Sequence, residues 1–177
     1  MWRRKIIIRL YYIYPSFNLI IKIKVAMKRL SLLLILSLIG ASLFAQSVEK
    51  EVEAIKAVIQ SAYVDGIQNE GDIEKIDAGI HPDFNLLGIG KDGVIWKLPI
   101  AEWKKKVIER KENGQLPRQA DNLISVKFLS VDVTGTAAVA KFEFYVGKEL
   151  KYVDYISLYK FNDGWKLVSK TFYKFES

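Results

Sequence analysis

The sequence has no cysteine and only one histidine, and these absences narrow its chemistry. Without cysteine there can be no disulfide, no thiolate metal ligand, no cysteine nucleophile and no lipid attached through a cysteine. The single histidine, His81, excludes a histidine-rich metal cluster. A phosphate-binding glycine loop, a Ser-His-Asp set and metal-ligand spacings are also missing. We therefore predict neither a cofactor nor a metal.

Positive charge is unevenly distributed along the 177 residues. The formal net charge is +7, yet residues 1–45 contain eight Lys/Arg and no acid. Residues 46–177 contain 19 Lys/Arg and 20 Asp/Glu, so this part has a net charge of −1. A balanced charge argues against a nucleic-acid-binding domain, and the interspersed acids Glu109 and Glu112 indicate that the basic segment 104–111 is a solvated helix face.

Residues 27–45 have the layout of a secretory signal peptide. Met27-Lys28-Arg29 is a short basic start, an apolar run from Leu30 to Ile39 follows, and small residues lead to Ala45. The apolar run is shorter than the roughly 20 residues that span a bilayer. We predict cleavage near Ala45 and a secreted or periplasmic product that does not bind the membrane after signal removal. The alternative is a retained membrane anchor.

In residues 1–26, apolar residues recur neither at helical spacing nor at every second position. Ile, Lys, Tyr, Asn and Phe dominate this stretch, and A/T-only codons encode them. We interpret it as translated upstream sequence, with Met27 as the true start, or else as an extension of the basic end of the signal. The folded domain is expected over residues 46–177.

The first half of this domain is predicted to contain two helices, a short hairpin and a third helix. Apolar residues at three- and four-residue spacing predict a helix from Ser47 to about Gly66, and a second short helix is expected from Asp72 to Pro82. Two short strands, 83–90 and 94–98, flank an Asp-Gly turn. A third helix begins at Pro99 and stops at Asn113-Gly114.

The second half reads as four long strands joined by tight turns. The strands are expected over 121–133, 136–146, 149–161 and 165–175. Consecutive strands with such turns pair antiparallel. Helices packed on one face of an antiparallel sheet define an α+β domain, which is the fold class we predict.

Alternation along the strands predicts which side chains face the interior. Tyr152, Asp154, Ile156 and Leu158 share one side of the third long strand. On the last strand we assign the side that bears Trp165, Leu167, Ser169, Thr171 and Tyr173 to the interior, because Lys166, Lys170 and Lys174 share the other side. This assignment gives a mostly apolar interior with a few hydroxyls and one carboxylate, Asp154, as in a small-molecule site.

The domain resembles the nuclear-transport-factor-2-like superfamily. The resemblance rests on YVDGIQNEGD (63–72), IHPDF (80–84), the Lys91-Asp92-Gly93 hairpin and above all DYISLYKFNDGWKLVSKTF (154–172). This last segment is most similar to the bacterial group called putative lumazine-binding proteins. The resemblance implies a cone-shaped, curved antiparallel sheet wrapped by about three N-terminal helices, with a pocket at its open end. It also implies a homodimer formed through the sheet.

The superfamily includes isomerases, dehydratases and cyclases, and the resemblance therefore implies candidate catalytic residues. Tyr63 matches the tyrosine of the steroid isomerases, but the stretch where their base aspartate lies reads Asn85 to Ile89, without an acid. The dehydratases use a histidine–acid pair, but the sequence offers no acid partner for His81. Asp154 and His81 are therefore weak candidates for a catalytic base, each with a structural alternative.

Three functional hypotheses remain open from the sequence. The first, which we favour, is an exported, non-catalytic domain that binds a small apolar or aromatic ligand. The second is an isomerase, dehydratase or cyclase with Asp154 as base. The third is an interaction module that dimerises through the face bearing Tyr155, Tyr159 and Phe172. The candidate ligand-binding residues are Tyr63, Trp96, Asp154, Ser169, Thr171 and Tyr173.

Overall fold

The computed structural model of the chain describes residues 22, 24, 27, 28 and 48–176. The chain divides into two compact units, Met1–Ser47 and Val48–Ser177, and the account below concerns the second. The predicted signal peptide lies outside the described residues apart from Met27 and Lys28. None of the helices in the described segments is long and apolar enough to cross a membrane.

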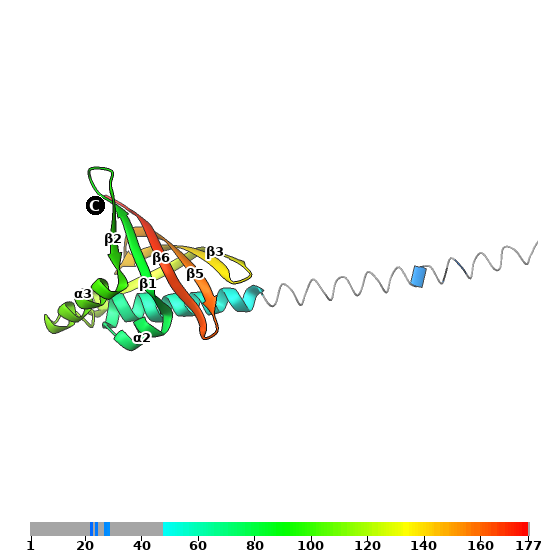
Figure 1. Ribbon diagram of the computed structural model, residues 1–177, viewed down its shortest axis with the longest axis horizontal. Coiled ribbons are helices and arrows are strands. Elements are labelled where there is room, and N and C mark those ends of the chain that lie inside the picture. Colours follow the sequence, from blue (N-terminus) through cyan, green and yellow to red (C-terminus); the bar gives the residue numbers. More distant parts are fainter. Residues whose placement is uncertain (1–21, 23, 25–26, 29–47, 177) are drawn as a thin grey trace, which may run out of the picture. The chain divides into compact units, whose positions relative to one another are not determined.

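The domain begins with a long helix that runs beneath the sheet (Figure 1). Residues 48–58 are α-helical, and the helix continues as a π-type segment, η1 (Ile59–Glu70). The helix ends at Gly71, whose φ of 68° is a left-handed conformation that glycine adopts without strain. The buried side of η1 includes Ile59, Tyr63 and Ile67, so this helix supplies much of the core.

Two further helices and a one-turn element complete the helical layer. The short helix α2 (Ile73–Gly79) is capped by Asp72, whose carboxylate accepts from the backbone N–H groups of Glu74 and Lys75. The third helix, α3 (Ile100–Glu112), follows Pro99 as predicted. A single 3₁₀ turn, η2 (Ala120–Asn122), precedes the long strands. Two helices, a short hairpin, a third helix and then the long strands is the order that the sequence predicts.

The sheet has six strands in the order β2-β1-β6-β5-β4-β3. The strands are β1 (Ile80–Ile89), β2 (Ile95–Pro99), β3 (Ile124–Thr134), β4 (Ala137–Val146), β5 (Glu149–Phe161) and β6 (Gly164–Lys174). Neighbouring strands that follow one another in the sequence pair antiparallel, as expected, whereas β1 pairs parallel with β6. This long-range pairing places the short hairpin beside the last strand. The α+β prediction is confirmed.

The second helix ends earlier than predicted, and His81 and Pro82 belong to β1. Helix α2 stops at Gly79 and the strand starts at Ile80. Proline cannot donate a ladder hydrogen bond, and the pairing of β1 with β6 is interrupted between Ile80 and Asn85. The irregularity that Pro82 imposes therefore falls inside the first strand and not at a helix end.

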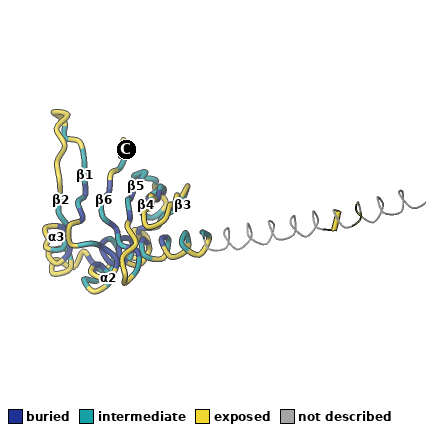
Figure 2. Tube along the Cα trace, turned by 45° about the vertical axis from the view of Figure 1, so that its right-hand side comes forward, coloured by how far each residue is buried: buried dark blue, intermediate teal, exposed yellow. Residues whose placement is uncertain are grey.

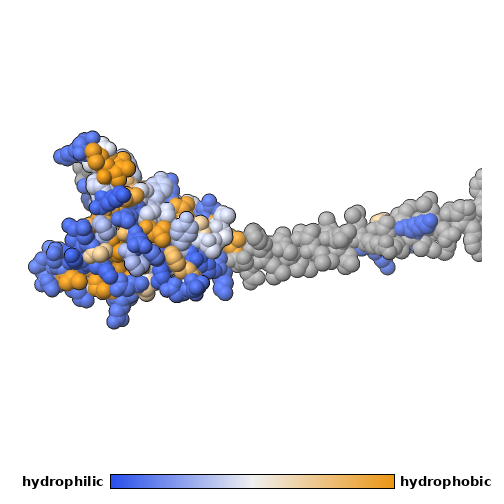
Figure 3. Space-filling model, in the orientation of Figure 1, coloured by the Kyte–Doolittle hydropathy of each residue, from blue (hydrophilic) through white to orange (hydrophobic). Residues whose placement is uncertain are grey.

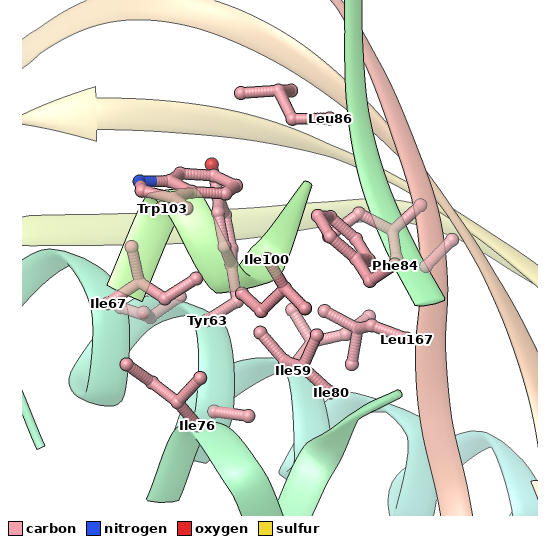
Figure 4. Packing of buried hydrophobic residues seen from close by; sticks show 14 of the residues in the cluster. Ile59, Tyr63, Ile67, Ile76, Ile80, Phe84, Leu86, Ile100, Trp103 and Leu167 are labelled. Carbon is pink, nitrogen blue, oxygen red and sulfur yellow. The ribbon is translucent and has the colours of Figure 1, made fainter. Parts of the chain in front are cut away.

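The core lies between the curved sheet and the helices, where the buried residues concentrate (Figure 2). Figure 4 shows isoleucines from the helical layer packed against Phe84 and Leu167 of the sheet. The β1–β2 hairpin extends away from this core, and its end is exposed (Figures 1 and 2). Apolar side chains gather near that end, including Ile89, Val94 and Ile95 (Figure 3).

Candidate functional site

A β-bulge in β6 decides which side chains face the interior. Ser157 pairs with Ser169 but Leu158 pairs with Leu167, so Val168 is an extra residue on the β6 side. An extra residue reverses the alternation beyond it. Trp165 and Leu167 face inward before the bulge, and Lys170 and Phe172 face inward after it.

Three predicted site residues therefore lie on the other face. Ser169 pairs with Ser157 and Asn85, both on the outer side of the sheet. Thr171 is exposed, and the Tyr173 side chain is 60% exposed. The assignment of these three residues to the interior is wrong, because strict alternation was assumed along a strand that contains a bulge.

The bulge also turns Lys170 into the interior, beside Asp154. The Lys170 ammonium Nζ lies 2.9 Å from Asp154 Oδ1, in a buried ion pair. Asp154 Oδ2 accepts a hydrogen bond of 2.8 Å from the Tyr63 hydroxyl. Asp154 is fully buried and Lys170 is only 5% exposed. The assignment of Lys170 to the side of β6 away from the interior is therefore wrong.

Aromatic rings surround the Lys170 ammonium. The nitrogen lies 4.8 Å from the centroid of the Phe172 ring, 5.2 Å from that of Tyr63 and 6.0 Å from that of Tyr152. The ring faces carry negative charge that attracts a cation, most strongly where water is excluded. The rings and the Asp154 carboxylate together compensate for the loss of water around this lysine. Lys170, Asp154, Tyr63, Tyr152 and Phe172 are called the charged cluster below.

Burial shifts the pKa values of Asp154, Lys170 and Tyr63 toward their neutral forms. Burial raises the pKa of Asp154, against the opposing charge of Lys170 and the hydrogen bond from Tyr63. Burial likewise lowers the pKa of Lys170, against the charge of Asp154. For Tyr63, burial and then the Asp154 charge raise the pKa well above its usual value, so the phenol stays protonated and donates.

A cavity of about 370 Å³ opens beside the charged cluster. Aromatic side chains supply much of its wall: Tyr63, Trp103, Phe144, Tyr152 and Phe172. Three cationic side chains also line it, namely Lys170, Lys174 and Arg118. The remaining wall residues are Gln68, Leu86 and Val146. Figure 4 shows Tyr63 extending from the long helix toward Trp103, which belongs to α3. The cavity thus lies where the helical layer meets the inner face of the sheet.

The other predicted site residues lie apart from this wall. Asp154 contacts the wall residues Tyr63 and Lys170 from behind and does not itself line the cavity. Trp96 is 39% exposed and packs near Phe172, with ring centroids 6.1 Å apart. His81 stacks on Phe161 with centroids 4.9 Å apart, and its Nδ1 accepts a hydrogen bond of 3.2 Å from the Asp83 N–H.

Sequence reasoning missed the wall residues Lys170, Lys174 and Arg118. For the two lysines a signal was present: the large apolar residues of β6 change parity, from the odd positions Trp165 and Leu167 to the even position Phe172. Such a change indicates a bulge. For Arg118, in an irregular segment, no periodic signal existed. Among the described residues, no cluster of three His, Asp or Glu could hold a metal ion.

The sequence matches the profile of the family described as "Putative lumazine-binding" over residues 50–173. The chain belongs to this family. A comparison with curated proteins gave no match.

Solved structures place the domain in the nuclear-transport-factor-2-like fold. A protein of unknown function from Silicibacter pomeroyi DSS-3 superposes with a TM-score of 0.58 at 16% identity, over 72% of this chain and 98% of that one. One from Shewanella baltica OS155 gives 0.56 at 20% identity, over 72% and 96%. A third, from Methylobacillus flagellatus KT, gives 0.53 at 22% identity, over 72% and 94%. These likenesses establish the fold.

Proposed function

We propose that the domain binds a small apolar or aromatic molecule in the cavity beside the charged cluster, without catalysing a reaction. The observation that carries the proposal is the cavity itself, with a volume of about 370 Å³ and five aromatic residues in its wall. This volume lies in the range of about 300–1,000 Å³ typical of ligand pockets. A mostly aromatic wall with a few polar groups favours a flat apolar ligand.

The position of Asp154 supports binding over catalysis. A general base must reach the proton that it removes, directly or through one water. Asp154 is fully buried behind the wall, with one oxygen bound to Tyr63 and the other paired with Lys170. His81 is engaged with Phe161 and the Asp83 backbone. Both sequence-predicted base candidates are thus occupied by protein contacts.

The binding proposal is tested by filling the cavity. Val146→Trp puts a bulky ring on the wall, and Val94→Trp is the control, at an exposed valine of the β1–β2 hairpin outside the wall. We expect thermal shift and native mass spectrometry to detect an aromatic ligand from a broad panel with the unmodified protein and with Val94→Trp, but not with Val146→Trp. The absence of any ligand for the unmodified protein contradicts the proposal.

We also propose that the product is exported. The support is the basic, apolar and small-residue order of residues 27–45. Expression in a bacterial host should give a periplasmic or secreted product whose mass corresponds to a chain beginning near Gln46. A membrane-bound product that retains residues 27–45 would show a retained anchor.

A second candidate function is self-association through the outer face of the sheet. Exposed apolar side chains on this face come from three adjacent strands: Val139, Tyr155, Tyr159 and Tyr173. Exposed apolar side chains on one face of a sheet are a feature of interaction sites. Phe172, which we assigned to this face, instead faces inward because of the bulge. Sedimentation should show a dimer, and Tyr155→Glu should dissociate it. A monomer at all concentrations would exclude self-association through this face.

A further inference from the structure

The charges around the cavity are all of one sign. Its wall contains Lys170, Lys174 and Arg118, and no aspartate or glutamate among the described residues. The charge of Lys170 is compensated from behind by Asp154, at 2.9 Å. The net positive charge that faces the cavity therefore comes from Lys174 and Arg118.

Neither of these two cations has a carboxylate partner within residues 48–176. Lys174 is exposed at the end of β6 and forms no ion pair there. Arg118 is half-buried, and its Nε and Nη1 donate to the backbone carbonyls of Gln68 and Asn122, at 3.0 and 3.4 Å. These contacts fix the guanidinium without neutralising it. Burial lowers the pKa of Arg118, but a guanidinium remains charged at physiological pH.

The aromatic cage in the wall is already occupied by a cation of the protein itself. Phe172, Tyr63 and Tyr152 surround the Lys170 ammonium at 4.8, 5.2 and 6.0 Å. A cationic ligand would meet Lys170 where it would otherwise meet ring faces, and no wall acid offers a counter-charge. Cation recognition, the usual use of such a cage, is thereby disfavoured.

We infer that the cavity selects an anionic aromatic ligand, whose ring packs on the aromatic wall and whose carboxylate or sulfonate contacts Lys174 and Arg118. The inference rests on the proposed function and adds the charge of the ligand. Hydrogen bonds between a guanidinium and a carboxylate are charge-assisted and stronger than neutral ones. Since Lys174 is exposed, part of the selectivity should weaken as salt increases.

The test compares ligands of nearly equal shape that differ in charge. The first pair is 2-naphthoate and 2-naphthamide, and the second is 1-anilinonaphthalene-8-sulfonate and N-phenyl-1-naphthylamine. Affinities are measured by calorimetry or ligand-observed NMR for the unmodified protein, for Lys174→Met and Lys174→Glu, and for Lys105→Met. The last variant removes an equal charge from the exposed face of α3, outside the cavity wall.

We expect each anion to bind the unmodified protein and Lys105→Met at least about tenfold more tightly than its neutral partner, as charge-assisted contacts allow. The ratio should fall severalfold in Lys174→Met and further in Lys174→Glu, while the affinity for the neutral partner stays constant. Equal affinities within both pairs overturn the inference and leave the proposed function intact. Binding of no member of either pair overturns both.

Discussion

The Lys170 ammonium lies 2.9 Å from Asp154 Oδ1 inside the domain, where neither side chain is appreciably exposed. The two residues come from adjacent strands, β5 and β6, and share the inner face of the sheet. A buried pair contributes little stability compared with apolar residues of the same size, but loss of one partner leaves a charge without water or counter-charge. The pair therefore makes this part of the core depend on both residues at once.

Removing either charge alone should destabilise the domain strongly. Asp154→Asn leaves the Lys170 charge unpaired, and Lys170→Met leaves the Asp154 charge unpaired; each should cost about 3–5 kcal/mol in the free energy of unfolding. The double variant should recover most of that loss, because both charges are then gone. Urea unfolding of the four proteins measures the coupling. Single variants that each cost less than about 1 kcal/mol would show that water reaches the pair.

Tyr63→Phe should destabilise the domain while keeping the aromatic packing. The variant removes the 2.8 Å hydrogen bond to Asp154 Oδ2 and leaves a buried carboxylate oxygen without its donor. The expected cost is about 1.5–3 kcal/mol. The bond from Tyr63 also lowers the pKa of Asp154, so its removal should raise that pKa further. Denaturant unfolding and NMR titration of the carboxyl group measure the two effects, and an unchanged carboxyl titration would contradict the second.

Glu51→Gln should reduce stability near neutral pH but not in acid. Glu51 accepts hydrogen bonds of 2.7 Å from Lys160 and from the Trp165 indole, which join the first helix to the β5–β6 hairpin. The Lys160 bond and then the Trp165 bond lower the pKa of Glu51 below its usual 4.5. A depressed folded-state pKa gives stability that is present above the unfolded-state pKa and disappears as pH falls through the folded-state value.

The loss for Glu51→Gln should therefore be about 1 kcal/mol or less at pH 7, as for a charge-assisted bond at a partly exposed site. It should shrink as pH falls below the ordinary carboxyl range. Urea unfolding from pH 7 to pH 3 provides the comparison, with Glu74→Gln as a control, since Glu74 forms no ion pair in the described part of the chain. A difference between the unmodified protein and Glu51→Gln that stays constant with pH would rule out this role.

Gly79→Ala should destabilise the domain although alanine is the better helix former. A Cβ at position 79 would lie 2.6 Å from Ala62 Cβ and 2.6 Å from Val58 Cγ2, so α2 packs on the long helix at a distance that only glycine allows. Overpacking of this kind costs about 1–3 kcal/mol, more than the gain in helix propensity of at most about 1 kcal/mol. Adding Ala62→Gly should recover part of the loss in thermal unfolding; no recovery would place the strain elsewhere.

Much of the fold was predictable because local signals agree with it. The apolar stripe of the first helix, the Asp-Gly turn at 92–93 and the glycine-containing turns between the long strands set the order of elements and the antiparallel pairs. Asp154 was placed in the interior correctly, since β5 alternates regularly from Asp154 to Leu158. The parallel contact of β1 with β6 was not predicted, because turn chemistry specifies pairing only between neighbours in the sequence.

The site was predicted less well than the fold, for one local reason. Alternation fixes the face of a residue only while the strand is regular, and the extra residue at Val168 moved every later side chain of β6 to the opposite face. Tyr63 was identified through its match to the superfamily. Lys170 was placed outside on the argument that lysines avoid cavities, an argument that fails when a carboxylate and three rings compensate for lost hydration.

The bulge allows a side chain to change face without any substitution. A strand of the same residues that ran without the bulge would turn Ser169 and Thr171 inward, where this chain has Lys170 and Phe172. Deletion of Val168 would have no such effect, because the shorter, regular strand keeps Leu167, Lys170 and Phe172 on one face. The charge beside the cavity is therefore set by the register of the last strand, and a comparison of relatives by residue identity alone would miss a change that comes from the bulge.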